Sequence, residues 1–419
     1  MRVRGSLRVP GDKSISHRSL ILGALGDGES RITHILPSAD VHSTAAVLRR
    51  LGVHIPDLSP DFVIRGAGLR GLRQPDGELE CGNSGTTTRL MAGVVSALPV
   101  EATFIGDASL SRRPMRRVAT PLTEMGASFT LPPHGGLPMT IRGGALRGIA
   151  WTSEVASAQI KSAILLASLV AGVRSTVAEP VKSRDHTERM LAARGVTLQM
   201  TATAATIDPP AALASLDVDV PGDPSSAAFF AALAAAATHG ELRLEGVCMN
   251  PTRTGFFETL KRMGASVREE NRREDGGDVV ADLVVGHAPL YATTVVARDV
   301  PAMVDELPLL ACLATCAFGE TSITGANELR VKESDRIAAV VNNLRAIGAD
   351  ATELSDGMLI RGAKHPLRGR IATHGDHRLA MAFGILGALG ENEIQIDDRD
   401  CVGVSYPGFW TDLERVCSR

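Results

Sequence analysis

Aromatic residues are scarce in this chain: tryptophan, tyrosine and phenylalanine together make up 3% of its 419 residues. Proteins that hold single-stranded nucleic acid stack the bases on aromatic side chains, so this composition argues against such a partner. The formal net charge of −3 at pH 7 provides no overall positive field for a phosphate backbone either. We therefore expect no nucleic-acid partner.

Long apolar runs and closely paired cysteines are also missing. No stretch of about 18 residues is apolar without charges or turn residues, so the sequence predicts no membrane span. The first residues, MRVRGSLRVPG, alternate like a strand and do not form the apolar core of a signal sequence. We therefore expect a cytoplasmic protein whose mature form starts at Met1. The six cysteines form no CxxC pair, which predicts buried, reduced thiols and no metal site.

What the chain does have is repetition. The end of a helix, a glycine and the start of a strand recur at LRRLGVHI, LTEMGASF, LAARGVTL, LKRMGASV and LRAIGADA. The glycines at positions 52, 126, 195, 264 and 348 are spaced roughly every 70 residues. Each is predicted to take the left-handed conformation that ends a helix.

A second pattern alternates with the first and predicts the fold class. Six apolar helices rich in small residues run into strands, and they are apolar on nearly every face. We therefore expect an α/β fold of six units with buried helices and outer sheets. The units divide into three and three, with the break near 221–224, where VDVPGDPSSAAFF contains several turn residues.

Polar residues gather where a strand meets the buried helix of each unit. These junctions read PGDKS, GNSGTTTR, SAQIKS, GDPSSAA, VDELP and HGDHR. PGDKS lacks the GxxxxGK[ST] spacing of a nucleotide phosphate loop, but a helix N-terminus still favours an anion. The segments RRP, SRDHTER and RVKESDR add cations. We therefore expect a cleft for a substrate that carries more than one phosphate or carboxylate.

Two acids, Asp305 in VDELP and Glu333 in VKESD, interrupt this positive lining. One carboxylate among cations can act as a general base and a second as an acid, although an ordinary ion pair is the commoner role for either. His374 and His377 are three residues apart, but no third ligand motif accompanies them, so we expect no metal. No nucleophile elbow or dinucleotide turn occurs in a fitting context, which predicts acid–base and electrostatic catalysis without a cofactor.

Ten stretches taken together resemble the 5-enolpyruvylshikimate-3-phosphate synthase family. In order from residue 10 to residue 410 they are PGDKSISHR, GNSGTTTRLM, RRPM, SAQIKSA, SRDHTERML, GDPSSAAFF, DELPLLA, ELRVKESDR, GDHRLAM and SYPGFW. The resemblance implies a two-domain inside-out α/β barrel with three βαβαββ units in each domain. It places the first strand in the second globule, so that domain I holds 1–11 and 222–419 and domain II holds 12–221. It also implies an active site in the cleft between the domains, which closes on substrate.

The resemblance implies a reaction as well. The enolpyruvyl (1-carboxyvinyl) group of phosphoenolpyruvate is transferred to the 5-hydroxyl of shikimate 3-phosphate, and phosphate is released. This is a step of the shikimate pathway to chorismate and the aromatic amino acids. The expected partners are these two small-molecule substrates, with no cofactor, and we expect a monomer.

Site residues follow from the positions that match the family motifs. Shikimate 3-phosphate is expected at Lys13, Ser14, Arg18, Ser157, Ala158 (through its backbone), Gln159, Ser183, Asp305 and Lys332. Phosphoenolpyruvate is expected at Lys13, Asn83, Gly85, Arg113, Gln159, Arg336, His377 and Arg378. Asp305 is the expected base for the 5-hydroxyl, and Glu333, with Lys13, is expected to handle the proton at the methylene carbon.

One departure and several alternatives accompany this interpretation. Some relatives carry a lysine just before the segment that matches SYPGFW, where this chain has Val404. The sister enzyme, UDP-N-acetylglucosamine enolpyruvyl transferase, is an alternative, although Ala108 stands where its loop has a cysteine. A non-catalytic anion-binding relative and a scaffold with a basic surface are further alternatives. Because Gly85 matches a position beside phosphoenolpyruvate, we expect competitive inhibition by glyphosate that Gly85→Ala weakens.

Overall fold

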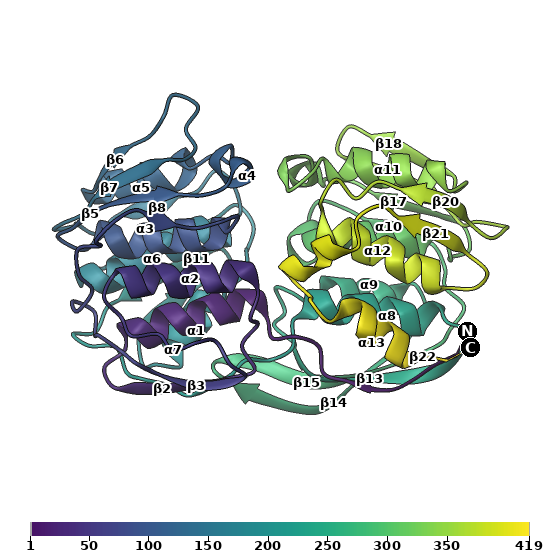
Figure 1. The fold of residues 1–419 in the computed structure, drawn as a ribbon, viewed down its shortest axis with the longest axis horizontal. Helices are drawn as coiled ribbons and strands as arrows, with labels where there is room; N and C mark the ends of the chain where they lie inside the picture. Colours follow the sequence, from purple (N-terminus) through teal and green to yellow (C-terminus); the bar gives the residue numbers. More distant parts are fainter. Residues whose placement is uncertain (1, 419) are drawn as a thin grey trace. The chain divides into compact units, whose positions relative to one another are not determined.

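The computed structural model describes residues 2–418, and the chain divides into two compact units (Figure 1). Among the described residues, unit 1 holds 2–10, 221–273 and 279–418, and unit 2 holds 11–220 and 274–278. The boundaries predicted from the sequence differ from these by one residue, and the expected cleft stays a prediction. None of the described helices combines the length and apolar character that a membrane crossing needs.

The short segment 274–278 corrects the predicted division, which assigned it to domain I. It lies in unit 2 because Asp278 contacts two residues of that unit, at 2.7 Å from His186 Nδ1 and 3.5 Å from Arg189 Nε. Gly277 also lies close to the backbone of Arg189, where a Cβ atom would come within 2.5 Å of the carbonyl oxygen. These contacts hold the segment against unit 2.

Unit 2 consists of three α/β repeats. The first contains α1 (Lys13–Leu25), β2 (Glu29–Thr33), α2 (Ala39–Arg50) and β3 (Asp61–Arg65). The second contains β4 (Leu79–Glu80), α3 (Gly85–Ser96), β5 (Glu101–Ile105), α4 (Ala108–Ser111), α5 (Arg116–Met125), β6 (Ser128–Thr130) and β7 (Met139–Arg142). The third contains β8 (Ala150–Thr152), α6 (Ala158–Ala171), β9 (Ser175–Ala178), α7 (His186–Ala192), β10 (Thr197–Met200) and β11 (Ala204–Asp208), and β12 (Val218–Asp219) follows.

Unit 1 repeats the scheme, with longer strands β13, β14 and β15 in its first sheet. Its helices are α8 (Pro224–Ala236), α9 (Gly255–Arg262), α10 (Leu307–Ala314), α11 (Arg336–Ala346), α12 (His377–Ala388) and α13 (Phe409–Val416). Its strands are β1 (Arg2–Leu7), β13 (His239–Cys248), β14 (Ser266–Asp275), β15 (Asp278–Gly286), β16 (Thr294–Val295), β17 (Glu320–Ile323), β18 (Ala351–Leu354), β19 (Gly357–Arg361), β20 (Arg368–Ile371), β21 (Glu393–Ile396) and β22 (Cys417–Ser418). Short 3-10 helices are η1 (Val300–Ala302), η2 (Val304–Glu306), η3 (Asn327–Val331) and η4 (Asp400–Val404).

The sheets show how each repeat is built. Unit 2 has sheets in the orders β12-β2-β3, β4-β5-β7-β6 and β10-β11-β9-β8, and unit 1 has β14-β15-β13-β1-β22, β16-β17-β19-β18 and β20-β21. Every repeat has one parallel strand pair: β12 with β2, β4 with β5, β8 with β9, β1 with β13, β16 with β17 and β20 with β21. Two parallel strands that follow each other in the chain need a crossover connection between them. In four repeats this connection contains the buried helix: α3, α6, α10 or α12.

Two of these pairs join strands that are distant in the sequence. β1 pairs with β13, so that Arg2 lies opposite His239 and Leu7 opposite Leu244. β12 pairs with β2 in the other unit, where Val218 lies opposite Ile32. The N-terminal strand thus completes the first sheet of unit 1, and β12 completes the first sheet of unit 2.

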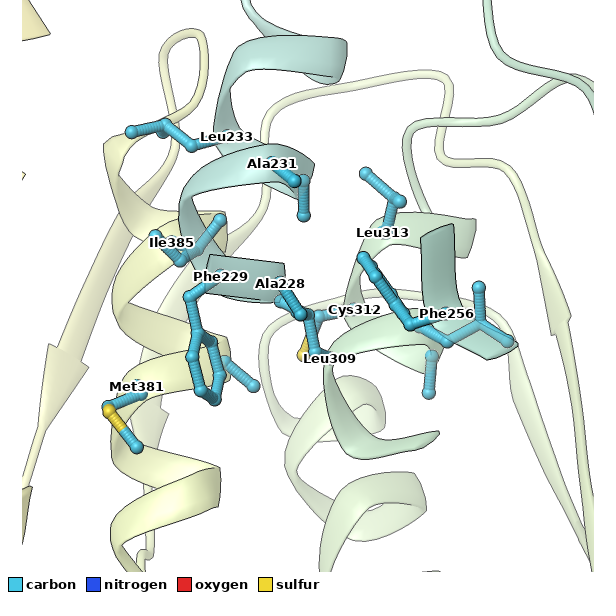
Figure 2. Packing of buried hydrophobic residues seen from close by; sticks show 14 of the residues in the cluster. Ala228, Phe229, Ala231, Leu233, Phe256, Leu309, Cys312, Leu313, Met381 and Ile385 are labelled. Atoms are coloured by element: carbon cyan, nitrogen blue, oxygen red, sulfur yellow. The ribbon is translucent and has the colours of Figure 1, made fainter. Parts of the chain in front are cut away.

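The apolar helices are buried, as the sequence predicts. Every residue of α8 from Pro224 to Ala235 is buried. Figure 2 shows Phe229 of α8, Leu309 of α10 and Met381 of α12 among the packed residues of the unit 1 core. The predicted helix-ending glycines are also confirmed, because all five have positive φ angles, from 79° to 120°. The fold is therefore the inside-out α/β arrangement of buried helices and outer sheets.

The prediction for the cysteines was wrong in part. All six lie outside disulfides, but only Cys81, Cys248 and Cys312 are buried. Cys316 is exposed because α10 ends at Ala314, so that this residue lies in the turn that follows the helix.

Candidate active site

In unit 2, Lys13 is held at the start of α1. Asp12 caps this helix by accepting a hydrogen bond from the Ile15 amide at 2.8 Å, which fixes the first turn. Lys13 Nζ forms an ion pair with Asp40 from the start of α2, and 27% of its side chain stays exposed. The ammonium is therefore oriented by a carboxylate without being removed from solvent.

Arg18 lies further along α1 and is buried. Its guanidinium donates to Thr187 Oγ1 at 2.7 Å, to Ser162 Oγ at 2.9 Å and to the carbonyl of Ser14 at 2.9 Å. These three acceptors are neutral, and burial lowers the pKa of Arg18 to about 10. The positive charge is thus held rigidly beside the helix N-terminus, where it favours a bound anion.

Three predicted phosphoenolpyruvate residues lie together at the start of α3. Arg113 donates to the side-chain oxygen of Asn83 and, at 3.3 Å, to its carbonyl. Asn83 Nδ2 in turn donates to Asp107 Oδ2 at 2.6 Å. At Gly85 a Cβ atom would lie 2.8 Å from a guanidinium nitrogen of Arg89 and 3.5 Å from one of Arg113. The glycine leaves space beside two cations.

Arg89, which the sequence interpretation missed, contacts one of the predicted site residues and lies near another. It donates to Gln159 Oε1 at 2.7 Å, and Gln159 Nε2 donates to Thr86 Oγ1 at 3.1 Å. Arg89 ends the motif GNSGTTTR, one turn after Gly85, so a signal was present in the sequence. Its bond to Gln159 joins the starts of α3 and α6.

At the start of α6, the predicted shikimate residues share a partner. Ser157 caps the helix and its amide donates to Glu179 Oε1 at 2.9 Å, and Ala158 is the first helical residue. Ser183 Oγ donates to the same carboxylate oxygen at 2.7 Å. Glu179 was not predicted, and it brings these two serines together.

In unit 1, Arg336 is buried at the start of α11 among three carboxylates. Its guanidinium lies 2.8 Å from Asp376, 2.7 Å from Glu333 and 3.5 Å from Asp305. Burial alone would lower the pKa of Arg336, but the charges of Asp376 and Glu333 outweigh it and raise the pKa above its ordinary value. The structure therefore gathers Arg336, Glu333 and Asp305, all of which were predicted.

Asp305 also faces Arg378, the second residue of α12. The Asp305 carboxylate lies 3.8 Å from the guanidinium of Arg378, which donates to the Asp305 carbonyl at 3.2 Å. Asp305 thus lies between two arginines. Asp376, which the sequence interpretation missed, accepts from the Arg378 amide at 3.0 Å and also binds Arg336. His377 is buried at the first position of the same helix.

Two further positions from the sequence analysis, Lys332 and Val404, also lie in unit 1. Lys332 Nζ donates to Glu328 Oε1 at 3.0 Å, one turn back in the chain. Val404 ends η4, and the preceding cation in the sequence, Arg399, lies over the ring of Trp410 with 4.0 Å between guanidinium carbon and ring centroid. Arg399 is thus held on an aromatic ring, where a cation–π contact retains it.

Comparison with known proteins identifies the family of the chain. The family model described as EPSP synthase (3-phosphoshikimate 1-carboxyvinyltransferase) matches residues 1–413. A 3-phosphoshikimate 1-carboxyvinyltransferase from Sulfurihydrogenibium sp. is 49% identical, with 99% of this chain and 97% of the relative covered. Another, from Bacillus velezensis, is 45% identical over 100% of this chain and 98% of its own.

Solved structures give the same result. EPSP synthase from Acinetobacter baumannii has a TM-score of 0.90 and 41% identity, covering 99% of this chain and 96% of that one. The enolpyruvyl transferase NikO from Streptomyces tendae has a TM-score of 0.76 at 16% identity, covering 99% and 95% of the two chains, and it shows the fold alone. On the whole-chain match and these identities, the chain belongs to the EPSP synthase family.

Proposed function

We propose that this chain transfers the 1-carboxyvinyl group of phosphoenolpyruvate to the 5-hydroxyl of shikimate 3-phosphate and releases phosphate, in the pathway to chorismate. The observation that carries the proposal is Asp305, a carboxylate 3.5 Å from Arg336 and 3.8 Å from Arg378. A base among cations is what two anionic substrates and a hydroxyl nucleophile require. The relatives that carry this activity in their names support the assignment along the whole chain.

Substrate binding divides among the residues described above. We assign phosphoenolpyruvate to Lys13, Asn83, Gly85, Arg113, Gln159, Arg336, His377 and Arg378. We assign shikimate 3-phosphate to Lys13, Ser14, Arg18, Ser157, the Ala158 backbone, Gln159, Ser183, Asp305 and Lys332. Guanidinium groups suit the carboxylate and phosphate of each substrate because they donate two parallel hydrogen bonds.

The chemistry then needs two proton transfers and fixed positive charge. Glu333, with Lys13, supplies a proton to the methylene carbon of phosphoenolpyruvate, which makes the adjacent carbon electrophilic. Asp305 takes the proton of the 5-hydroxyl as its oxygen attacks that carbon. The tetrahedral adduct then loses phosphate and a proton from the new methyl group, which restores the double bond. The arginines stabilise the leaving phosphate because they are already oriented before the reaction.

The acceptor separates this proposal from its alternative. UDP-N-acetylglucosamine is the acceptor of the sister enzyme, and in this chain the loop position of the expected cysteine is Ala108, the first residue of α4. We infer that shikimate 3-phosphate is the acceptor and that the chain acts as a cytoplasmic monomer. Light scattering on the purified protein tests the monomer.

The test is phosphate release from phosphoenolpyruvate with each acceptor in turn. We expect release with shikimate 3-phosphate alone, and Asp305→Asn lowers kcat by about a thousandfold because the base is lost. Asp350→Asn, which changes an exposed acid of the same unit, serves as the control with unchanged rate. Release with the sugar nucleotide alone, or full activity of Asp305→Asn, contradicts the proposal.

A further inference from the structure

A buried group of three charges lies next to Ser157, at the start of α6, and Ser183, in the loop before α7. Lys161, one turn into that helix, is 2.8 Å from Glu179 and 2.9 Å from Glu188, and between 2% and 4% of the three side chains is exposed. Burying charges is costly even when they are paired, and apolar residues of similar volume often give a more stable protein. The group therefore calls for a reason other than stability.

The contacts of Glu179 supply that reason. Its carboxylate accepts hydrogen bonds from the Ser157 amide at 2.9 Å, from Ser183 Oγ at 2.7 Å and from the Ser183 amide at 3.3 Å. The two serines come from different segments, one at the start of α6 and one in the loop before α7. Glu179 is bonded to both, so its position fixes the distance between them.

From this geometry we propose that Glu179 is a positioning residue for the phosphate of shikimate 3-phosphate. It holds Ser157 and Ser183 where they bind the phosphate, and Lys161 holds Glu179 in turn. The inference rests on the proposed function, and it adds a residue that does not touch the substrate itself.

Charge and proton supply are compatible with this role. A carboxylate alone would repel a phosphate, but Lys161 lies against Glu179 and offsets its charge. A serine hydroxyl has one proton to donate, and in the ligand-free chain Ser183 donates it to Glu179. When the phosphate binds, this hydroxyl turns to it. Lys161 and the two serine amides stay on Glu179, so the carboxylate keeps three donors.

Glu179→Gln tests the role with little change of shape. In the variant, one carboxylate oxygen is replaced by an NH2 group, which cannot accept the hydrogen bonds that Ser157 and Ser183 donate to Glu179. At least one of the two serines must therefore move. We expect the affinity for shikimate 3-phosphate to fall about tenfold or more, as for loss of a hydrogen bond to a charged group. The affinity for shikimate, which has no phosphate, and the KM for phosphoenolpyruvate should stay unchanged. Calorimetry gives both affinities, and circular dichroism checks that the variant is folded.

Two further variants sharpen the test. Glu188→Gln is the matched control, because Glu188 contacts Lys161 and is expected to leave the phosphate preference as in wild type. Ser183→Ala combined with Glu179→Gln should lose less than the sum of the two single losses, because both remove the same contact. Should Glu179→Gln fail to fold, Glu179→Asp, which keeps the charge and shortens the side chain, is expected to show the same selective loss.

The results separate the inference from the proposed function. A wild-type chain that does not prefer shikimate 3-phosphate to shikimate overturns the proposed function and the inference with it. A wild-type chain with this preference and a Glu179→Gln variant that keeps it overturn the inference alone. Tighter binding of shikimate 3-phosphate by the variant also overturns the inference, because the carboxylate then repels the phosphate. An equal loss of affinity for both ligands overturns it as well, because Glu179 then supports only the fold.

Discussion

At the scale of single residues, the structure explains why a glycine stands among the residues proposed to bind phosphoenolpyruvate. Gly85 begins α3, and the space above it is bounded by the guanidinium groups of Arg89 and Arg113. An added methyl group would lie 2.8 Å from Arg89, which is the flexible end of a side chain and can move. The cost of the substitution therefore falls on the Arg89–Gln159 hydrogen bond and not on the backbone.

Gly85→Ala is accordingly expected to fold normally and to bind phosphoenolpyruvate more weakly. We predict a rise of about tenfold in KM for phosphoenolpyruvate, as for loss of a charged hydrogen bond, and weaker inhibition by glyphosate. The KM for shikimate 3-phosphate should change little. Steady-state kinetics with each substrate and with the inhibitor measure all three.

Arg89→Lys is the matched comparison for this prediction. It removes the guanidinium that contacts Gln159 and shortens the side chain, without adding a methyl group at position 85. If it raises the KM for phosphoenolpyruvate as Gly85→Ala does, the glycine acts through Arg89. Equal inhibition of wild type and Gly85→Ala would show that Gly85 lies away from the inhibitor.

At the scale of helices and strands, local pattern predicted the repeats but not the polar contacts between them. The helix-ending glycines were recognisable because the residue that ends a helix often has a positive φ angle, which glycine adopts at little cost. Arg89 and Gln159 are 70 residues apart, and Arg336 and Asp376 are 40 apart. Which of these side chains meet depends on how repeats pack, and a sequence pattern within one repeat carries no such information.

Packing between buried helices gives the next prediction. At Gly93 of α3 a Cβ atom would lie 2.2 Å from the carbonyl oxygen of Ala163 in α6, which is backbone and cannot rotate away. Gly93→Ala is therefore expected to lower the free energy of unfolding by about 3 kcal/mol, as overpacked cores do. Urea denaturation followed by circular dichroism measures the change.

Gly23 in α1 provides the control, because it is also a glycine inside a buried helix. A Cβ atom there would lie 3.5 Å from its nearest neighbour, Ile64 Cδ1, which is an ordinary contact. Gly23→Ala should be neutral or stabilise by about 0.5 kcal/mol through helix propensity. Equal destabilisation by both substitutions would mean that the approach of α3 to α6 is not what requires glycine.

At the scale of the whole molecule, the chain passes from unit 1 to unit 2 and back, and each unit is closed by a strand from a distant part of the sequence. It begins in unit 1 with β1, continues into unit 2 at residue 11, and returns at residue 221 after β12. Neither β1 nor β12 pairs with the repeat that follows it in the sequence. The strand character of residues 2–7 was predictable from their alternation, and their place in unit 1 came only from the family resemblance. Their pairing with β13 is visible only in the structure.

This topology predicts that damage to the N-terminal strand weakens segments in the middle of the sequence, α8 and β13. β1 lies between β13 and β22, and Leu7 is buried in the core of unit 1 with Phe229 and Leu244. Leu7→Ala removes buried methyl groups from that core and should cost about 3 kcal/mol of stability. In hydrogen exchange, the amides of α8 and β13 should lose protection, although the next helix along the chain from β1, α1, is in unit 2. The amides of β9 and β11 should exchange as in wild type, because their sheet and core lie in unit 2.

Val63→Ala, at an exposed position of β3, is the control and should change the exchange of neither set of amides. Loss of protection around α1 in place of α8 would contradict the pairing of β1 with β13, because it would mean that β1 supports the helix that follows it in the sequence.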